Sequence, residues 1–328
     1  MNSVKKGRPT LHVDDLHTWF YLRAGILKAV DGVTIEVGER EAVGLVGESG
    51  CGKSVTAFSV MGLVPVPGKI ADGSISFGDR CISTLSDEEM SKIRGRDISM
   101  IFQDPMTYLN PVFNVERQIM ETILLHQPVS EQEARRRTVE LLRSTGIPEA
   151  EKVAKYYPHQ LSGGMRQRVL IAMAIACNPA LIIADEPTTA LDVTVQAQIL
   201  RLIKRMKEEL KTSLLLITHD LGIVAHMCDR VYVMYAGKIV EHGDVWQIFK
   251  HARHPYTRGL LECVLSIDEF KKEVRTIDGS VPNLIHPPSG CRFRTRCAFA
   301  TAECCNDPSL TQIEEGHYLA CYNPQGDK

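Results

Sequence analysis

The sequence feature that most constrains the fold is the run Gly47-Glu48-Ser49-Gly50-Cys51-Gly52-Lys53-Ser54. It matches the pattern G-x-x-x-x-G-K-S at every fixed position, follows the apolar run 42–46 and precedes a helix-compatible segment, 55–61. A strand, a glycine-rich turn and a helix N-terminus together form a phosphate-binding loop, because backbone N–H groups can converge on phosphate oxygens where no Cβ intervenes. The sequence therefore predicts a nucleotide site in which Lys53 reaches the β- and γ-phosphates and Ser54 binds Mg²⁺.

Cys51 occupies a variable position of this loop and needs no role in the motif. Because it lies close to a helix N-terminus and to Lys53, we expect its thiol pKa to be lowered. Alkylation of Cys51 that bound nucleotide blocks is the corresponding prediction.

Size and composition indicate a globular protein of one large domain or two ordinary ones. The chain has 328 residues, of which 44% are hydrophobic and 24% are charged, and its formal net charge is −2, so it lacks the positive excess typical of nucleic-acid partners. Residues 1–10 are polar and do not read as a signal peptide. The longest nonpolar region, 169–184, is interrupted by Asn178-Pro179 and is too short to span a bilayer.

Predicted strands alternate with predicted helices along the chain, which favours an α/β fold with a mostly parallel sheet and flanking antiparallel hairpins. The expected strands are 11–20, 29–37, 42–46, 74–77, 98–102, 181–184 and 213–217, with a hairpin at 231–241. The expected helices are 86–94, which opens with a capping-box sequence, the helical region 115–146, a helix ending near residue 177, and 193–211.

Polar side chains follow three of these strands. Asp185 and Glu186 end the buried run 181–184, where Asp185 can hold Mg²⁺ and Glu186 can act as general base for the attacking water. For His219 the sequence leaves two interpretations. It contacts the γ-phosphate or the water, or it is a helix-entry residue beside the N-cap candidate Asp220. Gln103 can reach the metal or the water through its amide, although its position alone does not establish this.

The segment Leu161-Ser162-Gly163-Gly164-Met165 offers a second anion site, because small residues open a helix there. With it the chain resembles the ATP-binding cassette family over roughly residues 11–250. The family motifs occur in the family's order. Gln103 matches the glutamine loop, 161–167 the signature, Ala190-Leu191-Asp192 the D-loop and His219 the histidine switch. Near the start of the chain, Phe20 matches the aromatic residue that stacks on adenine, with Trp19 and Tyr21 as less favoured alternatives.

The resemblance implies a P-loop NTPase core with an antiparallel β subdomain and an α-helical signature subdomain at about 106–178. It also implies a head-to-tail dimer, in which ATP on one loop is covered by Ser162, Gly163 and Gly164 of the other subunit, next to the D-loop Asp192. ATP binding would close this dimer and hydrolysis would release it. The mechanism would be in-line attack by water on the γ-phosphorus.

The C-terminal segment narrows the resemblance. The runs 279–284, 287–293, 296–297 and 317–322 are similar to the C-terminal extension of oligopeptide/dipeptide importer ATPases. This implies a paralogous ATPase subunit as the partner in a heterodimer, two membrane permeases and an extracytoplasmic binding protein. The chain would be peripheral at the cytoplasmic face of the inner membrane. Related systems carry nickel chelates, opines or glutathione. We divide the chain into a tail at 1–10, a nucleotide-binding domain at 11–266 and the extension at 267–328.

The extension holds Cys291, Cys297, Cys304 and Cys321, spaced C-x5-C-x6-C-x16-C. Four thiolates suit a [4Fe–4S] cluster or tetrahedral zinc, and the absence of C-x2-C pairs argues against an ordinary zinc ribbon. The resemblance favours a structural iron–sulfur cluster. Unmetallated thiols are a further alternative, and the adjacent Cys305 could replace Cys304 as ligand.

Two other classes of protein compete with a transporter ATPase. A soluble cassette ATPase acting on ribosomes, DNA or cluster assembly usually has two cassettes, a coiled-coil insertion or a basic surface, and none of these is evident. A regulatory module without ATPase activity would need a damaged site, whereas Lys53, Glu186 and His219 are all present.

Overall fold

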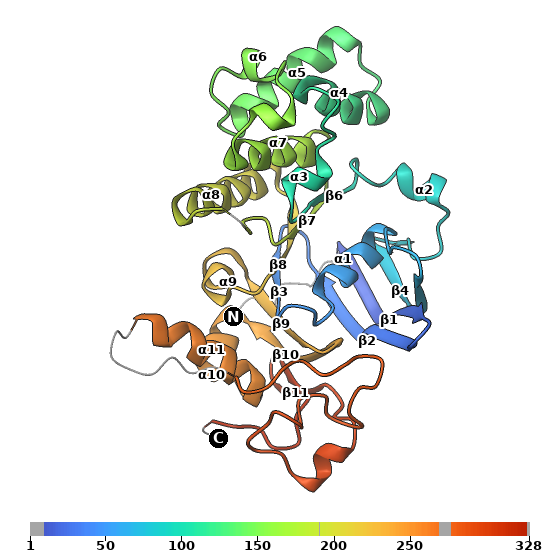
Figure 1. The fold of residues 1–328 in the computed structure, drawn as a ribbon, viewed down its shortest axis with the longest axis vertical. Coiled ribbons are helices and arrows are strands. Elements are labelled where there is room, and N and C mark those ends of the chain that lie inside the picture. The colour runs from blue at the N-terminus through green and yellow to red at the C-terminus, as the bar shows by residue number, and fades with distance from the viewer. Residues whose placement is uncertain (1–9, 190, 269–276, 327–328) are drawn as a thin grey trace. The chain divides into compact units, whose positions relative to one another are not determined.

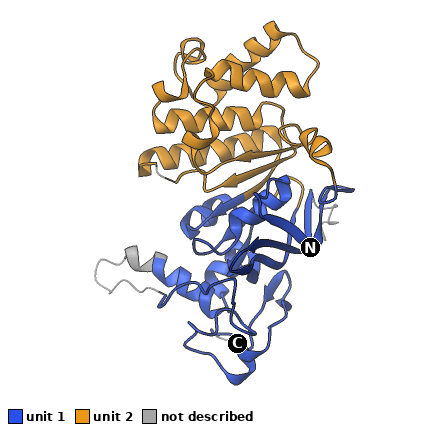
Figure 2. Cartoon of the chain, turned by 45° about the vertical axis from the view of Figure 1, so that its right-hand side comes forward, with its two compact units in different colours: residues 1–37, 42–84, 216–328 blue, residues 38–41, 85–215 orange. Residues whose placement is uncertain are grey.

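The computed structural model describes residues 10–189, 191–268 and 277–326, which form two compact units (Figure 2). Unit 1 contains residues 1–37, 42–84 and 216–328, and unit 2 contains residues 38–41 and 85–215. Most of the expected N-terminal tail, the D-loop residue Ala190 and the start of the expected extension lie outside the described residues.

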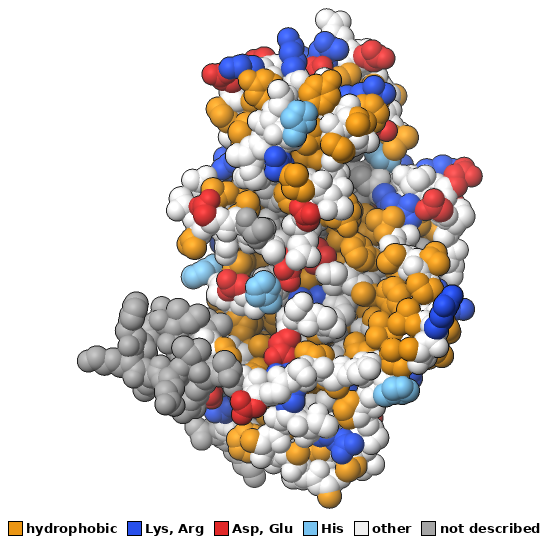
Figure 3. Space-filling view, in the orientation of Figure 1, with side chains coloured by type: hydrophobic (Ala, Val, Ile, Leu, Met, Phe, Trp, Pro, Cys, Tyr) orange, Lys and Arg blue, Asp and Glu red, His pale blue; other side chains and the backbone are white. Residues whose placement is uncertain are grey.

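Unit 1 contains an antiparallel sheet with the strand order β2-β1-β4-β5 (Figure 1). Its strands are β1 (Leu11–Leu22), β2 (Gly25–Val37), β4 (Gly68–Phe77) and β5 (Arg80–Cys81). Helix α1 (Lys53–Met61) packs against β1 and β2, and the Thr18 and Ser59 hydroxyls lie 2.7 Å apart between β1 and α1. Hydrophobic side chains gather on the surface over β1, β2 and β4 (Figure 3).

Five strands of the larger sheet lie in unit 1, in the order β11-β12-β10-β9-β3. They are β3 (Ala42–Val46), β9 (Arg230–Tyr235), β10 (Lys238–Asp244), β11 (Thr311–Glu314) and β12 (His317–Leu319). Strands β3 and β9 are parallel, whereas the hairpin β9–β10 and the pairs β10–β12 and β11–β12 are antiparallel. The helices of this part are α9 (Leu221–Met227), α10 (Val245–His251), α11 (Pro255–Asp268) and the short 3₁₀ helix η2 (Ala302–Cys305).

One hydrophobic core joins the C-terminal extension to this sheet. It contains Val46 of β3, Tyr235 of β9 and Tyr256 of α11 together with Phe293 and Cys304 of the extension. The extension therefore folds as part of unit 1.

Unit 2 contains the parallel pair β6 (Ile98–Ile101) and β7 (Leu181–Asp185), with Ile98 opposite Leu181. Every residue of both strands is buried, as continuous apolar runs in a parallel sheet predict. Its helices are α2 (Asp87–Ser91), α3 (Pro105–Tyr108), α4 (Val115–His126), α5 (Glu131–Ser144), α6 (Ala150–Val153), the 3₁₀ helix η1 (Pro158–Gln160), α7 (Gly163–Ile175) and α8 (Val193–Leu210). The boundary between the units falls within β8 (Ser213–Thr218).

The predicted fold class is confirmed, as are the main strands and helices, and two features differ. The helical region 115–146 divides into α4 and α5, because Gln127 precedes Pro128 and takes an extended conformation that ends α4. The extension contributes β11 and β12, which the turn-rich sequence did not indicate. In the described part of the chain, no helix combines the length and apolar character needed to cross a membrane.

Candidate functional site

The phosphate-binding loop lies between the end of β3 at Val46 and the start of α1 at Lys53. The Lys53 ammonium is buried and donates to the carbonyl oxygens of Gly47 at 2.8 Å and Glu48 at 3.0 Å. These carbonyls satisfy a charge that burial would otherwise make costly. The lysine is thereby held against its own loop at the helix N-terminus, where anions bind.

Two glycines of the loop are required by close packing. A Cβ at Gly47 would lie 2.1 Å from the Met234 carbonyl oxygen, and one at Gly52 would lie 2.3 Å from the Ala29 carbonyl oxygen. Gly52 also has a φ of 111°, which side chains rarely adopt. The fixed glycines of the motif are therefore explained by packing against β9 and β2.

The predicted lowering of the Cys51 pKa is wrong. Its side chain is fully buried, and burial raises the pKa of the thiol above its ordinary value, with Lys53 only partly opposing that effect. Cys51 does lie near a helix N-terminus, but desolvation of the thiolate affects its pKa more than the nearby positive charge does.

The candidate adenine-binding aromatics lie at the end of β1. The Phe20 ring packs closely against Gly68 of β4, where a Cβ would come within 2.6 Å of the ring. Trp19 donates from its indole nitrogen to Asp31 at 3.3 Å, and the Lys28 ammonium lies 4.8 Å from the indole centroid. Trp19 is therefore held by polar partners, whereas the phenyl ring of Phe20 carries no group that could form such a hydrogen bond.

In unit 2, the side chains predicted for catalysis meet at the end of β7. Asp185 is buried, and Glu186 follows in the left-handed conformation with φ of 43°. The Glu186 carboxylate accepts from the Gln103 amide at 3.1 Å and from the Thr189 hydroxyl at 2.8 Å. The sequence indicated Glu186 and Gln103 separately, and Thr189 was not anticipated.

The signature segment begins α7 as predicted. Ser162 is the N-cap residue and accepts from the Met165 N–H at 3.3 Å, so α7 starts at Gly163. A Cβ at Gly164 would lie 2.8 Å from a methyl group of Val195 on α8, which requires a small residue there. Asp192 caps α8 by accepting from the Val195 N–H at 2.9 Å.

His219 directly follows β8 and precedes the N-cap of α9. Asp220 is that cap, since its carboxylate accepts from the Ile223 N–H at 3.2 Å. The helix-entry interpretation of this segment is therefore confirmed for Asp220, while the contact of His219 with phosphate stays a prediction.

The five cysteines of the extension are free thiols. Burial raises the pKa of Cys291, Cys297 and Cys321, the last to about 11, and the charges of Cys291, Cys297 and Cys304 contribute to the shift at Cys321. Cys304 is buried, whereas Cys305 is exposed and accepts from Arg294. Even so, among the described residues no three Cys, His, Asp or Glu side chains are arranged to hold a metal ion. The predicted metal centre has no support from this arrangement.

Sequence reasoning missed two partners of the phosphate-binding loop. The Glu48 N–H donates to the Tyr256 hydroxyl at 2.8 Å. The Arg296 guanidinium donates to both Glu48 carboxylate oxygens, at 2.6 and 3.1 Å. Neither residue lies within a nucleotide-binding motif, and 248 positions separate Arg296 from Glu48, so no local pattern could indicate the contact.

Comparisons with known proteins agree with this geometry. Residues 30–189 match the ABC transporter family, and residues 240–304 match the C-terminal region of oligopeptide/dipeptide transporters. The oligopeptide transport ATP-binding protein AppD of Bacillus subtilis is 49% identical over 95% of this chain and 96% of its own length. OppD of Escherichia coli, also an oligopeptide transport ATP-binding protein, is 48% identical over 96% of this chain and 93% of its own length.

Solved structures extend the similarity to the fold. The ATP-binding cassette MJ0796, in a dimeric post-hydrolysis state bound to ADP and Pi, gives a TM-score of 0.65 at 28% identity, covering 72% of this chain and 98% of that chain. These similarities, together with the loop, the carboxylates and the signature helix, define a cassette ATPase. The chain belongs to the ABC transporter family, and within it to the ATP-hydrolysing subunits of oligopeptide/dipeptide transporters.

Proposed function

We propose that this chain powers the uptake of peptides through a membrane transporter by closing a head-to-tail dimer on ATP. The observation that carries the ATP site is the buried Lys53, held by two carbonyls of a glycine loop at a helix N-terminus. The name of the relative MJ0796, a dimeric cassette bound to ADP and Pi, supports the dimer. Substrate class rests on the C-terminal match to oligopeptide/dipeptide transporters, which disfavours a nickel, opine or glutathione carrier or a soluble ATPase.

Each predicted side chain has a chemical role in this proposal. Lys53 would bind the β- and γ-phosphates, and the backbone of residues 47–52 would donate to their oxygens. Glu186 would orient and deprotonate the attacking water, with its carboxylate held by Gln103. His219, and Ser162 to Gly164 of a second subunit, would stabilise charge on the γ-phosphate. Asp192 would act at the dimer interface, and Phe20 would stack on adenine.

Magnesium fits the donor set of these residues. Ser54, Gln103 and Asp185 would supply hydroxyl, amide and carboxylate oxygens, which are ligands that Mg²⁺ prefers. Asp185 is buried at the end of a parallel strand. When bound with ATP, the ion would neutralise phosphate charge.

The four cysteines Cys291, Cys297, Cys304 and Cys321 would hold a [4Fe–4S] cluster, or zinc as the alternative. The Cys291 N–H donates to the Cys304 carbonyl at 3.0 Å, and Cys291 and Cys304 belong to one hydrophobic core, against which Cys297 packs. Burial of Cys304 favours it over Cys305. Because metal binds thiolates and not thiols, loading would release protons and weaken as pH falls. The test is the iron, sulfide and zinc content of anaerobically purified protein. About four irons and four sulfides per chain, lost in Cys291→Ser, would support the cluster. One zinc per chain would show that zinc is the metal instead.

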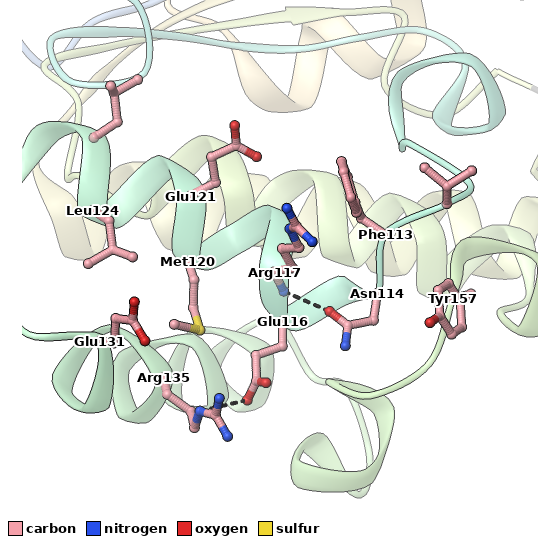
Figure 4. A pocket seen from close by; sticks show the side chains of 12 residues that line it. Phe113, Asn114, Glu116, Arg117, Met120, Glu121, Leu124, Glu131, Arg135 and Tyr157 are labelled. Carbon is pink, nitrogen blue, oxygen red and sulfur yellow. Dashed lines mark hydrogen bonds and ion pairs between the residues drawn. The ribbon is translucent and has the colours of Figure 1, made fainter.

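A groove on the helical part of unit 2 would receive the permeases. It has a volume of about 800 Å³ and lies between α4, α5 and the segment around Tyr157 (Figure 4). Its apolar lining includes Val112 and Leu125, which are 69% and 70% exposed, and its rim carries the ion pair Arg135–Glu116 at 3.6 Å. A lining that combines apolar side chains such as Leu124 with charged ones such as Arg117 fits an amphipathic helix from a partner. Docking there would hold the chain at the cytoplasmic face of the membrane.

The test is co-purification with the permease subunits of the transporter. Leu125→Asp should abolish co-purification and peptide-stimulated ATPase activity while ATP binding is unchanged. Val66→Asp, at a valine outside the groove that is 93% exposed, should leave both intact. Retained co-purification of Leu125→Asp would remove the groove from docking, and absence of permease and binding-protein genes nearby would argue against import. Co-purification of a second, different ATPase would support the paralogous pair.

A further inference from the structure

We propose that Arg296 of the C-terminal extension is a positioning residue for the phosphate-binding loop, so that ATP affinity depends on the extension through the contact of Arg296 with Glu48. The inference rests on the proposed role of residues 47–54 in binding phosphate. It goes beyond that role by assigning to the extension a direct part in nucleotide binding.

The contact has the geometry that only arginine can provide. Two guanidinium nitrogens of Arg296 donate to the two carboxylate oxygens of Glu48, at 2.6 and 3.1 Å. The Arg296 side chain is 5% exposed and that of Glu48 is 26% exposed, so the pair is only weakly screened by solvent. A planar, bidentate pair fixes both the direction and the distance of the carboxylate.

Arg296 is itself held rigidly, and it therefore serves as a fixed anchor. Its Nε donates to the Asp278 carbonyl at 2.8 Å, and one terminal nitrogen donates to the Ile277 carbonyl at 3.1 Å. The guanidinium also lies 5.7 Å from the ring centroid of Tyr235 and 5.9 Å from that of Phe293. A side chain restrained from so many sides transmits the position of the extension to the loop.

The backbone of Glu48 is held at the same time. Its N–H donates to the Tyr256 hydroxyl, and its carbonyl accepts from the Lys53 ammonium at 3.0 Å. Because the Glu48 carbonyl is one of the two that hold Lys53, a displacement of Glu48 also displaces the lysine that would contact ATP. Arg296 thereby acts on nucleotide binding without touching nucleotide.

Charge gives the contact a second effect. Glu48 places a carboxylate in a loop that must receive several negative phosphate charges, which is unfavourable unless that carboxylate is neutralised. Arg296 is the cation that pairs with it. Without Arg296, the loop would present a negative charge of its own to an anionic ligand.

The experiment measures the Kd of a fluorescent ATP analogue for the purified full chain, together with kcat and KM for ATP. Arg296→Gln should raise the Kd and KM about tenfold while kcat changes less than twofold, because the loop is misplaced but the hydrolytic residues are intact. Arg294→Gln is the matched control, since Arg294 contacts Ser289 and Cys305 within the extension. It should bind ATP as the parent does.

A double-mutant cycle isolates the contact. In a Glu48→Gln background, Arg296→Gln should cost less than about twofold, because no carboxylate remains for the arginine to hold or neutralise. Parental affinity of Arg296→Gln, or an equal loss in both backgrounds, would overturn the proposal. If Arg296→Gln does not fold, Glu48→Asp replaces it: the shortened carboxylate should weaken ATP binding, and unchanged affinity would overturn the proposal.

Lys53→Ala separates this inference from the proposed function. It should abolish ATP binding in either case. If Lys53→Ala still binds ATP normally, the assignment of the loop itself is wrong; if only the Arg296 variants behave like the parent, the loop stands and the positioning role falls.

Discussion

The side-chain amide of Gln103 donates a 3.1 Å hydrogen bond to the carboxylate of Glu186, across 83 positions of sequence. Thr189 donates to the same carboxylate oxygen at 2.8 Å. Two side-chain donors therefore orient the residue that we propose as general base. This arrangement leads to the first two predictions.

Glu186→Gln should lower the ATPase kcat by at least about 100-fold, because the amide cannot accept a proton from the attacking water. ATP binding should persist, and the closed dimer should accumulate because hydrolysis no longer releases it. Analytical size exclusion with ATP and a steady-state phosphate assay measure both effects. Glu209→Gln, at an exposed glutamate on α8, is the matched control. Turnover at the parental rate would remove Glu186 from its role.

Gln103→Ala removes one of the two donors to Glu186 and should reduce kcat about tenfold, equivalent to about 1.4 kcal/mol, with a smaller effect on ATP affinity. Thr189→Val should act in the same direction because it removes the other donor. Steady-state kinetics of the two single variants and the double variant measure whether the donors act together. Additive, negligible losses in kcat would show that orientation of Glu186 does not limit the reaction.

Cys51 should resist alkylation in the folded protein, since its thiol is buried and its pKa is raised. Cys81 should react much faster, because it is exposed and a hydrogen bond with Ser83 lowers its pKa. Iodoacetamide labelling at neutral pH, followed by peptide mass spectrometry, compares the two rates within one sample. Labelling of Cys51 as fast as Cys81 would contradict the buried geometry.

His254 should make the protein less stable in acid. It is fully buried, and burial lowers its pKa to about 4, although nearby Glu241 opposes the shift. The unfolded chain, with a histidine pKa of about 6.5, then binds the proton more readily. The neutral, buried His254 therefore contributes about 3 kcal/mol to the free energy of unfolding. This contribution is complete above about pH 6.5 and is lost as the pH falls through 4.

The measurement for His254 is the free energy of unfolding by urea between pH 7 and 4, for the parent and for His254→Asn. Asparagine can still accept from the Tyr256 N–H, which His254 Nδ1 accepts at 3.1 Å. His317, which pairs with Glu241 at 2.9 Å, remains in both proteins. The parent should lose more stability than the variant over this range, and parallel pH profiles would refute the assignment.

The sequence predicted those features that depend on short stretches of chain. Gly47 to Ser54 could be read as a phosphate-binding loop because its glycines and its lysine act within a few residues of one another. Likewise, the predicted capping box at Ser86 and the predicted N-cap Asp220 both have partners three residues further on. Local chemistry of this kind is visible in the order of residues alone.

Features that depend on long-range packing could not be predicted. Desolvation of Cys51 comes from segments distant in sequence, including the loop after β9, where the Gly237 N–H donates to the Cys51 carbonyl. The pairing of Arg296 with Glu48 and of Gln103 with Glu186 depends on how strands and loops distant in sequence converge. The arrangement of the cysteine side chains in the extension also depends on packing, so their spacing alone does not establish a metal site.

Strand β12 pairs with β10, with Tyr318 opposite His242, so the last part of the extension covers what would otherwise be the edge of the sheet. Removing the extension would leave N–H and C=O groups of β10 unpaired. It would also expose the part of the hydrophobic core of unit 1 that packs with Phe293. A shortened protein would then carry an exposed strand edge that can pair with other chains and cause aggregation. Domain-swap engineering with other cassettes must therefore exchange β9, β10 and the extension as one piece.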